Sequence, residues 1–331
     1  MTACAASGEE RQNGGSASSG QVPGTLVGSG EGLAGGDSGI PIGGGANSGL
    51  PGSQGLGPNA DGLNTEADSC TQVDLLFVVD NSPSMGKYQE SLAQAFPAFV
   101  DAMYERLPPG TSLHVGLTTT PFDQTGNCSE AVSNCVTTAS EAEIRTHYTT
   151  PDLGDTGNNG DQGKLYKYQG LTWFDADTGD PDREPLKRWF AGAAVEAGER
   201  GCSFEMPSAA AGWALHPANA SSNTGFLRDD DTVLLVFVLS DEPDKSPDAI
   251  TSYVNMITAA KSTCGGASCV VPAGIVNGCI EGVNNPLWQF LHGFGSTPVI
   301  GDIDDQGNYA AVVGDALADV IETTCNEIIL Y

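Results

Sequence analysis

The chain contains 331 residues, of which 13 are Lys or Arg and 42 are Asp or Glu, which gives a formal net charge of −29. An excess of negative charge this large repels nucleic acid and anionic lipid, so the sequence excludes nucleic acid as a partner. It favours solubility and attracts divalent cations, and no stretch of the chain is apolar and long enough to span a bilayer.

The first 69 residues are predicted to lie outside the folded domain. From about Gly8 to Asp68 they are dominated by Gly, Ser, Pro and Asn, so we expect a flexible linker that cannot bury enough apolar surface to fold. Met1 to Ser7 resemble the end of a bacterial lipoprotein signal, without the hydrophobic stretch that belongs before it. The resemblance implies that Cys4 is lipidated, that this anchor is the only membrane contact, and that the protein is an outer-membrane lipoprotein. The alternative is a cysteine with no such role.

A strand, a polar loop and a helix are predicted between residues 74 and 107. After Asp74 the chain continues as an unbroken apolar run to Val79, which is typical of a strand buried on both faces. Asp80, Ser82 and Ser84 alternate in the loop that follows, at the strand end where ligands bind in open α/β sheets. Their oxygen atoms suit a hard divalent cation. The alternative is that a serine caps the next helix and Asp80 favours its N-terminus. Apolar residues three and four apart predict that helix: Leu92, Phe96, Phe99, Met103 and Leu107.

A further strand is predicted over residues 112–118, followed by a long loop insertion from about 119 to 200. The insertion carries acidic, glycine-containing loops at 152–161 and 175–182, whose carboxylates suit Ca²⁺ but lack the closing Glu of an EF-hand. Ordinary solvated turns are the favoured interpretation. Four aromatic residues are predicted to anchor the insertion to the main domain: Trp173, Phe174, Trp189 and Phe190.

The second half of the chain continues the alternation of strands and helices. An apolar strand at 232–240 runs into Asp241, which brings a second carboxylate to the same edge of the sheet. A helix beginning near Ile250, a strand at 270–276, a short helix at 286–294 and a final helix from Tyr309 to Ile321 follow. The pattern predicts an α/β fold with a doubly wound, mostly parallel sheet flanked by helices.

The two strand ends resemble those of a von Willebrand factor A domain, over roughly residues 70 to 326. The resemblance rests on the D-x-S-x-S loop after the first strand and on the Asp after the later one. It implies that Asp80, Ser82, Ser84 and Asp241 hold Mg²⁺, Mn²⁺ or Ca²⁺ in a metal-ion-dependent adhesion site. It also implies that a carboxylate from a protein partner completes the coordination shell.

One ligand of the family's site has no counterpart in the corresponding loop at 201–208. The family usually supplies a Thr there, whereas this loop contains none. Glu205 is the strongest substitute, and Ser203 and Ser208 are weaker candidates. A third carboxylate would hold a cation more tightly but reduce its attraction for an acidic ligand, which would make the site more structural than adhesive. The alternative is that Glu205 caps the next helix or faces water.

Eight cysteines remain after Cys4, and an even number indicates an oxidising compartment. Zinc is the alternative, but none of the four histidines lies near a cysteine pair in the sequence. Cys70 and Cys325 bracket the domain, and the ends of the fold that the sequence resembles lie close together, so we predict a bond between them. Bonds Cys128–Cys135 and Cys264–Cys269 would close short loops, which leaves Cys202 with Cys279. This is one of the 105 ways in which eight cysteines can pair.

The sequence contains no G-x-S-x-G elbow, no H-E-x-x-H motif and no dinucleotide fingerprint, so we do not expect an enzyme. We predict two regions, 1–69 and 70–331, the second being a surface-tethered, extracytoplasmic binding domain. It would use its metal site for adhesion or protein–protein interaction at the cell envelope. The alternative is a structural envelope or fibre subunit in which the metal only stabilises the loops.

Overall fold

A computed structural model describes residues 71–123, 137, 139–151, 159–228, 232–280 and 282–319. The predictions for Cys4 and the linker lie outside these residues. One sheet of six strands runs through the described domain in the order β3-β2-β1-β4-β5-β6. The strands are β1 (Gln72–Val79), β2 (Ser112–Thr119), β3 (Trp173–Asp177), β4 (Val233–Ser240), β5 (Val270–Val276) and β6 (Val299–Asp302). Only the edge strand β3 is antiparallel, so the predicted doubly wound, mostly parallel sheet is confirmed.

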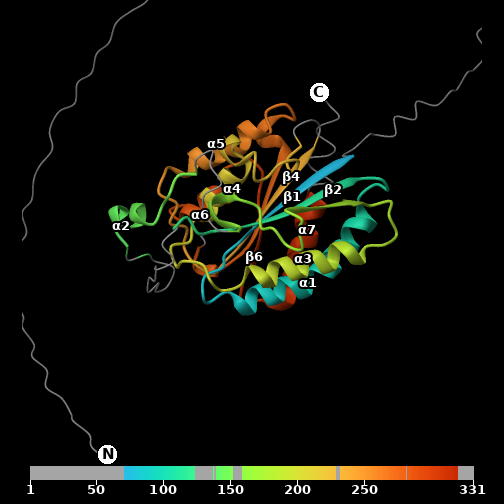
Figure 1. Cartoon of the computed structure of the whole chain (residues 1–331), viewed down its shortest axis with the longest axis horizontal. Helices are drawn as coiled ribbons and strands as arrows, with labels where there is room; N and C mark the ends of the chain where they lie inside the picture. Colours follow the sequence, from blue (N-terminus) through green and yellow to red (C-terminus); the bar gives the residue numbers. More distant parts are fainter. Residues whose placement is uncertain are drawn as a thin grey trace, which may run out of the picture. The chain divides into compact units, whose positions relative to one another are not determined.

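Helices cover both faces of this sheet (Figure 1). One face carries α1 (Gly86–Arg106), α3 (Glu184–Ala197) and α7 (Tyr309–Asp319). The other carries α4 (Pro207–Leu215), α5 (Ile250–Ala260) and α6 (Pro286–Leu291). The short helix α2 (Glu141–Thr146) has no buried residue. The central strands are buried on both sides because each lies between these two helical layers, which is why their sequences are apolar throughout.

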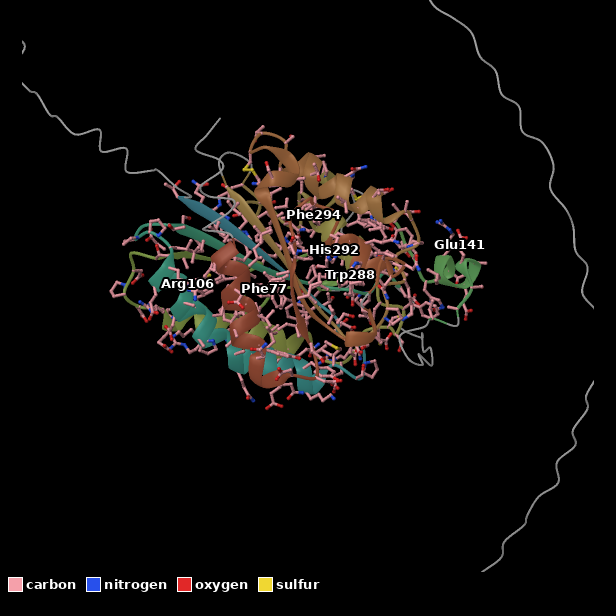
Figure 2. All side chains as sticks on the ribbon, turned by 180° about the vertical axis from the view of Figure 1, so that it is seen from behind. Phe77, Arg106, Glu141, Trp288, His292 and Phe294 are labelled. Carbon is pink, nitrogen blue, oxygen red and sulfur yellow. A yellow bond between two sulfur atoms is a disulfide. The ribbon has the colours of Figure 1, made fainter. Side chains whose placement is uncertain are left out.

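Aromatic side chains fill the layer between the sheet and α1 and α3. Phe77 of β1 lies at the centre of this layer (Figure 2), with its ring centroid 4.5 Å from that of Phe190 and 5.7 Å from that of Phe96. Phe96 and Phe190 stack on each other, so α1 and α3 meet through the same cluster. At the end of α1, Arg106 donates a hydrogen bond to the carbonyl of Gly314 on α7. These contacts fix α1, and with it the loop that precedes it.

The segment predicted as a long loop insertion contributes to the domain itself. Its second half forms β3 and α3, and β3 pairs with β2 from Ser112–Asp177 to Gly116–Trp173. The loop prediction failed here because β3 is a short edge strand in which acidic residues alternate with apolar ones, a pattern shared with solvated turns. The predicted anchoring role of the aromatics is confirmed, because Trp189 and Phe190 are buried on α3.

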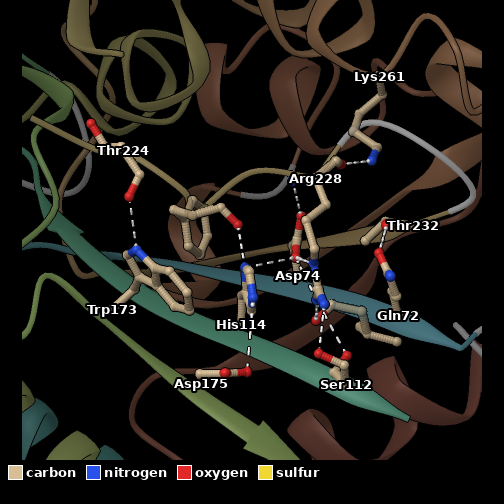
Figure 3. A network of polar contacts seen from close by, with 12 residues as sticks. Gln72, Asp74, Ser112, His114, Trp173, Asp175, Thr224, Arg228, Thr232 and Lys261 are labelled. Carbon is tan, nitrogen blue, oxygen red and sulfur yellow. Dashed lines mark hydrogen bonds and ion pairs between the residues drawn. The ribbon is translucent and has the colours of Figure 1, made fainter. Parts of the chain in front are cut away.

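Buried charges close the end of the sheet opposite the strand termini that carry the serine loop (Figure 3). Asp74, at the start of β1, is fully buried and accepts hydrogen bonds from the backbone N–H and the Nε of Arg228, both at 2.8 Å. Arg228 also donates to Ser112 of β2, and its carbonyl accepts from Lys261 after α5. One arginine thus connects β1 and β2 with the residue that follows α5.

The disulfide between Cys264 and Cys269 is confirmed and joins the end of α5 to the start of β5. Cys202 and Cys279 are also disulfide-bonded, and the predicted bond between the two stays a prediction. The pairings Cys70–Cys325 and Cys128–Cys135 lie outside the described residues.

Candidate metal centre at the carboxyl edge of the sheet

The loop between β1 and α1 folds around the carboxylate of Asp80. The backbone N–H of Ser82 donates to Asp80 Oδ1 at 2.8 Å, and Ser240 Oγ donates to Asp80 Oδ2 at 2.7 Å. Gln89 of α1 donates to the carbonyl of Asp80 at 2.8 Å. Asp80 and Ser82 are fully buried, whereas Ser84 is exposed. A short side chain at each of these positions therefore has a fixed direction.

Hydrogen bonds connect this loop to the end of β4. The hydroxyl oxygens of Ser82 and Ser84 are 3.1 Å apart, and Ser84 Oγ donates to Asp241 Oδ1 at 3.2 Å. The structure thus brings together the four residues that the resemblance assigned to the site. The alternative in which a serine caps α1 is wrong, because the N-cap is Met85 and the backbone N–H of Gly86 donates to Glu199 Oε1 at 3.0 Å.

Glu205 comes to the same edge from the loop before α4. Its side chain is fully buried, and neither carboxylate oxygen has a hydrogen-bond partner among the described residues. Burial excludes the alternative in which Glu205 faces water. The helix-cap alternative is also wrong, because the N-cap of α4 is Met206 and the N–H of Ala209 in its first turn donates to Ser246 Oγ, not to Glu205. Of the weaker candidates, Ser208 donates its hydroxyl to Asp244, and Ser203 contributes its carbonyl to the ammonium of Lys245.

Burial raises the pKa of the carboxyl groups at this edge, and neighbouring negative charges raise it further. Burial, together with the charge of Asp241, raises the pKa of Asp80 to about 7, against the opposing hydrogen bonds from Ser82 and Ser240. Burial and the charges of Asp80 and Glu242 raise the pKa of Glu205 well above its usual value. Burial also raises the pKa of Asp241. Lys245, whose ammonium lies 2.8 Å from Glu242 Oε2, offsets only part of this charge.

The residues at this edge fit a hard divalent cation. Oxygen atoms are the ligands that Mg²⁺, Mn²⁺ and Ca²⁺ prefer, and the donor set consists of carboxylates and hydroxyls. A buried carboxylate with two unpartnered oxygens is costly unless something positive compensates it, and Glu205 is such a group. The donors Asp80, Ser82, Ser84, Asp241 and Glu205 would hold the ion.

Sequence reasoning missed two hydroxyl residues at this edge. Ser240, the last residue of β4, orients Asp80. Thr120 follows β2, is fully buried, and has a hydroxyl oxygen without a hydrogen-bond partner among the described residues. The backbone N–H of Met206 donates to the carbonyl of Thr120 at 3.3 Å, which places that strand end next to the Glu205 loop. Both residues lie at the carboxyl end of a parallel strand, and that position in the sequence could have identified them as candidates.

A second group of metal-type ligands does not form a metal site. Potential ligand atoms of Asp123, His147 and Cys202 lie within 4.8 Å of one another. Cys202 is disulfide-bonded, so its sulfur is not available as a thiolate ligand. His147 Nδ1 and Asp123 Oδ2 are hydrogen-bonded at 2.6 Å, and the His147 ring stacks on Phe204. This group stabilises the loop that leads to Glu205.

Comparison with known proteins gives similarities of fold. No family model and no curated protein matches the chain. Among solved structures, the match to a von Willebrand factor type A protein from Catenulispora acidiphila covers 76% of this chain and 43% of that protein's chain. The two are 12% identical, and the TM-score is 0.38. The match to proximal thread matrix protein 1 from the mussel byssus covers 78% of this chain and 49% of that one, at 12% identity and a TM-score of 0.41. The match to the pilus adhesin SpaC from Lactobacillus rhamnosus GG covers 76% of this chain and 30% of that one, at 12% identity and a TM-score of 0.39. The chain thus spans less than half the length of each.

Proposed function

We propose that this von Willebrand A-like domain is a binding protein, not an enzyme, and that it uses a divalent cation at the carboxyl edge of its sheet for adhesion or protein–protein interaction. The observation that carries the proposal is the buried, unpartnered carboxylate of Glu205 beside the hydrogen-bonded loop of Asp80, Ser82, Ser84 and Asp241. A bound cation supplies a coordination position for an oxygen ligand from a partner.

The residues of the chain prepare this site before any ion binds. Ser82 and Ser240 hold the two oxygens of Asp80 in fixed directions, and Gln89 holds the backbone of the same residue. Gln89 also donates to the carbonyl of Gly198, so α1 connects the serine loop to the end of α3. A rigid donor set of this kind reduces the ordering cost of binding.

An extracytoplasmic location is part of the proposal. The Cys264–Cys269 bond and the disulfide-bonded state of Cys202 and Cys279 support an oxidising compartment. In the described residues no helix has the length and apolarity to cross a membrane. We retain attachment of Cys4 to the outer membrane or cell surface as a proposal.

Thermal unfolding of the full chain tests the metal site. After EDTA treatment, saturating Mg²⁺, Mn²⁺ or Ca²⁺ should raise the melting temperature by about 5–10 °C for at least one ion. Asp80→Asn and Glu205→Gln should lose this response, whereas Asp248→Asn, an exposed carboxylate in the loop after β4, should keep it. An unresponsive wild-type protein, at ion concentrations far above any plausible Kd, would refute the metal site.

A structural role for the metal is the second candidate, and Glu205 is the observation that favours it. A third carboxylate neutralises the ion and so reduces its attraction for an acidic partner. Glu205→Thr should weaken metal affinity, and unchanged affinity would show that Glu205 is not a ligand. An adhesive site predicts that EDTA abolishes partner binding while the domain stays folded, whereas a structural site predicts loss of folding.

A further inference from the structure

A pocket of about 270 Å³ lies at the edge of the sheet opposite β3, and no part of the proposed function uses it. Its walls come from the end of β5, from α6 and the residue that ends this helix, and from β6 with the two residues before it. The volume lies just below the range of about 300–1,000 Å³ that is typical of ligand pockets, so the pocket has room for one small ring.

The packing of α6 leaves two aromatic side chains at this pocket. Leu287, Phe290 and Leu291 are fully buried in the cluster between α6 and the sheet. Trp288 and His292, one helical turn apart, line the pocket instead, and their ring centroids lie 4.0 Å from each other (Figure 2). Trp288 is half-buried and His292 is exposed, so the pair forms an aromatic wall that a ligand can reach.

The opposite wall is β6, whose alternation directs Asp302 to the side of the sheet that carries α6. Gly301 faces the other side, where a Cβ would lie 2.5 Å from the Val312 side chain of α7. Its neighbours Ile300 and Asp302 therefore project from the α6 side, and Ile300 packs against the apolar cluster there. Asp302 Oδ1 accepts the backbone N–H of Asp304 at 2.9 Å, which fixes the direction of the carboxylate.

Two hydrogen-bond acceptors of the pocket remain open to a ligand. A carbonyl can only accept, so His292 Nδ1 donates to the carbonyl of Trp288 at 2.9 Å, and Nε2 of the neutral ring is left as an acceptor. Asp302 Oδ2 faces Gly278, where a Cβ would lie 4.0 Å from this oxygen and would meet no other atom within that distance. The space between Gly278 and Asp302 is therefore open.

The indole N–H of Trp288 adds a donor, and it differs from those of the other tryptophans. Three of the four indole N–H groups donate to acceptors within the fold, at 2.8–3.2 Å: those of Trp173, Trp189 and Trp213. The indole N–H of Trp288 has no hydrogen-bond partner in the part of the chain that the structure describes, although the residue is half-buried. A buried indole N–H normally has a partner, so the pocket favours a ligand that brings an acceptor.

These groups together indicate the chemistry of the ligand. Sugar hydroxyl groups both donate and accept, so they match the indole N–H of Trp288 and the acceptors of Asp302 and His292 at once. The C–H groups of a sugar ring pack on the faces of aromatic side chains, which carry the negative part of the ring quadrupole. A quaternary ammonium ion also favours aromatic faces, but it would leave the indole N–H without an acceptor.

The charge of the pocket excludes acidic sugars. No lysine or arginine is among the described residues that line it, whereas Asp302 contributes a negative charge. The net charge of −29 repels anionic ligands at longer range. The ligand is therefore a sugar without a carboxylate, sulfate or phosphate group.

We propose that this pocket binds one neutral pyranose ring of a glycan. The ring packs on Trp288, accepts a hydrogen bond from its indole N–H, and donates to Asp302 Oδ2 and His292 Nε2. The site uses β5, α6 and β6 and none of the proposed metal ligands, so the inference goes beyond the proposed function and does not depend on it. A single ring makes few contacts, so its Kd should be about 1–10 mM.

A titration followed by nitrogen–proton correlation NMR tests the proposal on the full chain in EDTA. The probes are the methyl pyranosides of glucose, galactose and mannose, and the readout is the indole N–H signal of Trp288. At least one of these glycosides should shift this signal saturably, while the indole signals of the other three tryptophans stay in place. The matched control ligand is the methyl glycoside of glucuronic acid, which keeps the ring but adds a carboxylate and should bind more weakly.

Three variants test the contacts, and their melting temperatures show whether each remains folded. Asp302→Asn should weaken glycoside binding about three- to tenfold, because a neutral acceptor replaces a charged one. Asp305→Asn, the same change at an exposed position outside the pocket, should leave the affinity unchanged. Gly278→Val should abolish binding, because its side chain fills open space in the pocket without approaching another atom closely.

Four outcomes would overturn the proposal. The first is the absence of a saturable shift of the Trp288 signal with any of the three glycosides, and the second is an equal shift of all four indole signals. The third is an affinity that stays the same in Asp302→Asn or in Gly278→Val. The fourth is a shift produced by choline and by none of the glycosides, which would assign the pocket to a cation. Because the titrations are carried out in EDTA, failure of the metal proposal leaves a positive result intact.

Discussion

The residues at the carboxyl edge of the sheet differ in how their charge is compensated. Asp80 has hydrogen bonds to both oxygens and still has its pKa raised to about 7, because burial and the charge of Asp241 outweigh those bonds. Glu205 has no compensating bond among the described residues. In the absence of a cation these carboxylates favour a protonated state, and in its presence they must release their protons.

The titration of Asp80 leads to a prediction about pH. Its folded pKa is about 7 against an ordinary value of 3.8, so between these values the folded protein retains a proton that the unfolded chain releases. The stabilisation is complete below about pH 4 and is lost as the pH rises through about 7. In EDTA, wild type should therefore lose unfolding free energy relative to Asp80→Asn as the pH rises from 5 to 8, because Asn at this position does not titrate. Urea unfolding across this range measures it, and a constant difference would contradict the assignment.

The same protons compete with the cation. Because Asp80 and Glu205 must be deprotonated to bind, apparent metal affinity should rise as the pH increases through about 7, where Asp80 loses its proton. Calorimetric titration with the ion preferred in the thermal test measures this. An affinity independent of pH would show that neither carboxylate contacts the ion.

At the scale of elements, two features tie strands to their neighbours. The Asp74–Arg228 pair connects β1 and β2 at the amino end of the sheet, and the Cys264–Cys269 bond joins α5 to β5. Burial raises the pKa of Asp74 in spite of Arg228, so the pair holds the strands in place at a desolvation cost. Neither feature touches the candidate metal centre, so each can be removed to test stability alone.

Removing Arg228 should be strongly destabilising. Arg228→Met leaves the buried carboxylate of Asp74 without its partner, which should cost about 3–5 kcal/mol. Arg183→Met removes a partly exposed pair with Asp101 and should cost less than about 1 kcal/mol. Urea unfolding of both variants measures the contrast. Equal losses of unfolding free energy in the two variants would show that the buried pair stabilises the fold no more than the exposed pair does.

The disulfide provides a second test at this scale. It closes a loop of only a few residues, so Cys264→Ser with Cys269→Ser should lower the free energy of unfolding by about 2 kcal/mol. Metal affinity should stay unchanged, because the bond lies at the amino end of β5. A loss of metal binding without a loss of stability would contradict this arrangement.

At the scale of the whole molecule, charge dominates. A net charge of −29 produces self-repulsion that a compact domain must overcome. Monovalent salt screens this repulsion, so NaCl should raise the urea midpoint of the cation-free protein. A midpoint that is insensitive to NaCl would show that the acidic residues are spaced widely enough to be already screened.

The sequence by itself determined the sheet's central strands and two of the site's loops. Those strands are apolar because both faces are buried, and a polar residue that ends such a strand lies at the ligand-binding edge, so Asp80 and Asp241 could be placed together. Only the tertiary structure decided the rest. Edge strand β3 has no such pattern, and Thr120 and Ser240 become relevant through contacts with other segments. Burial of Glu205 is a product of packing between distant segments, which local periodicity does not encode.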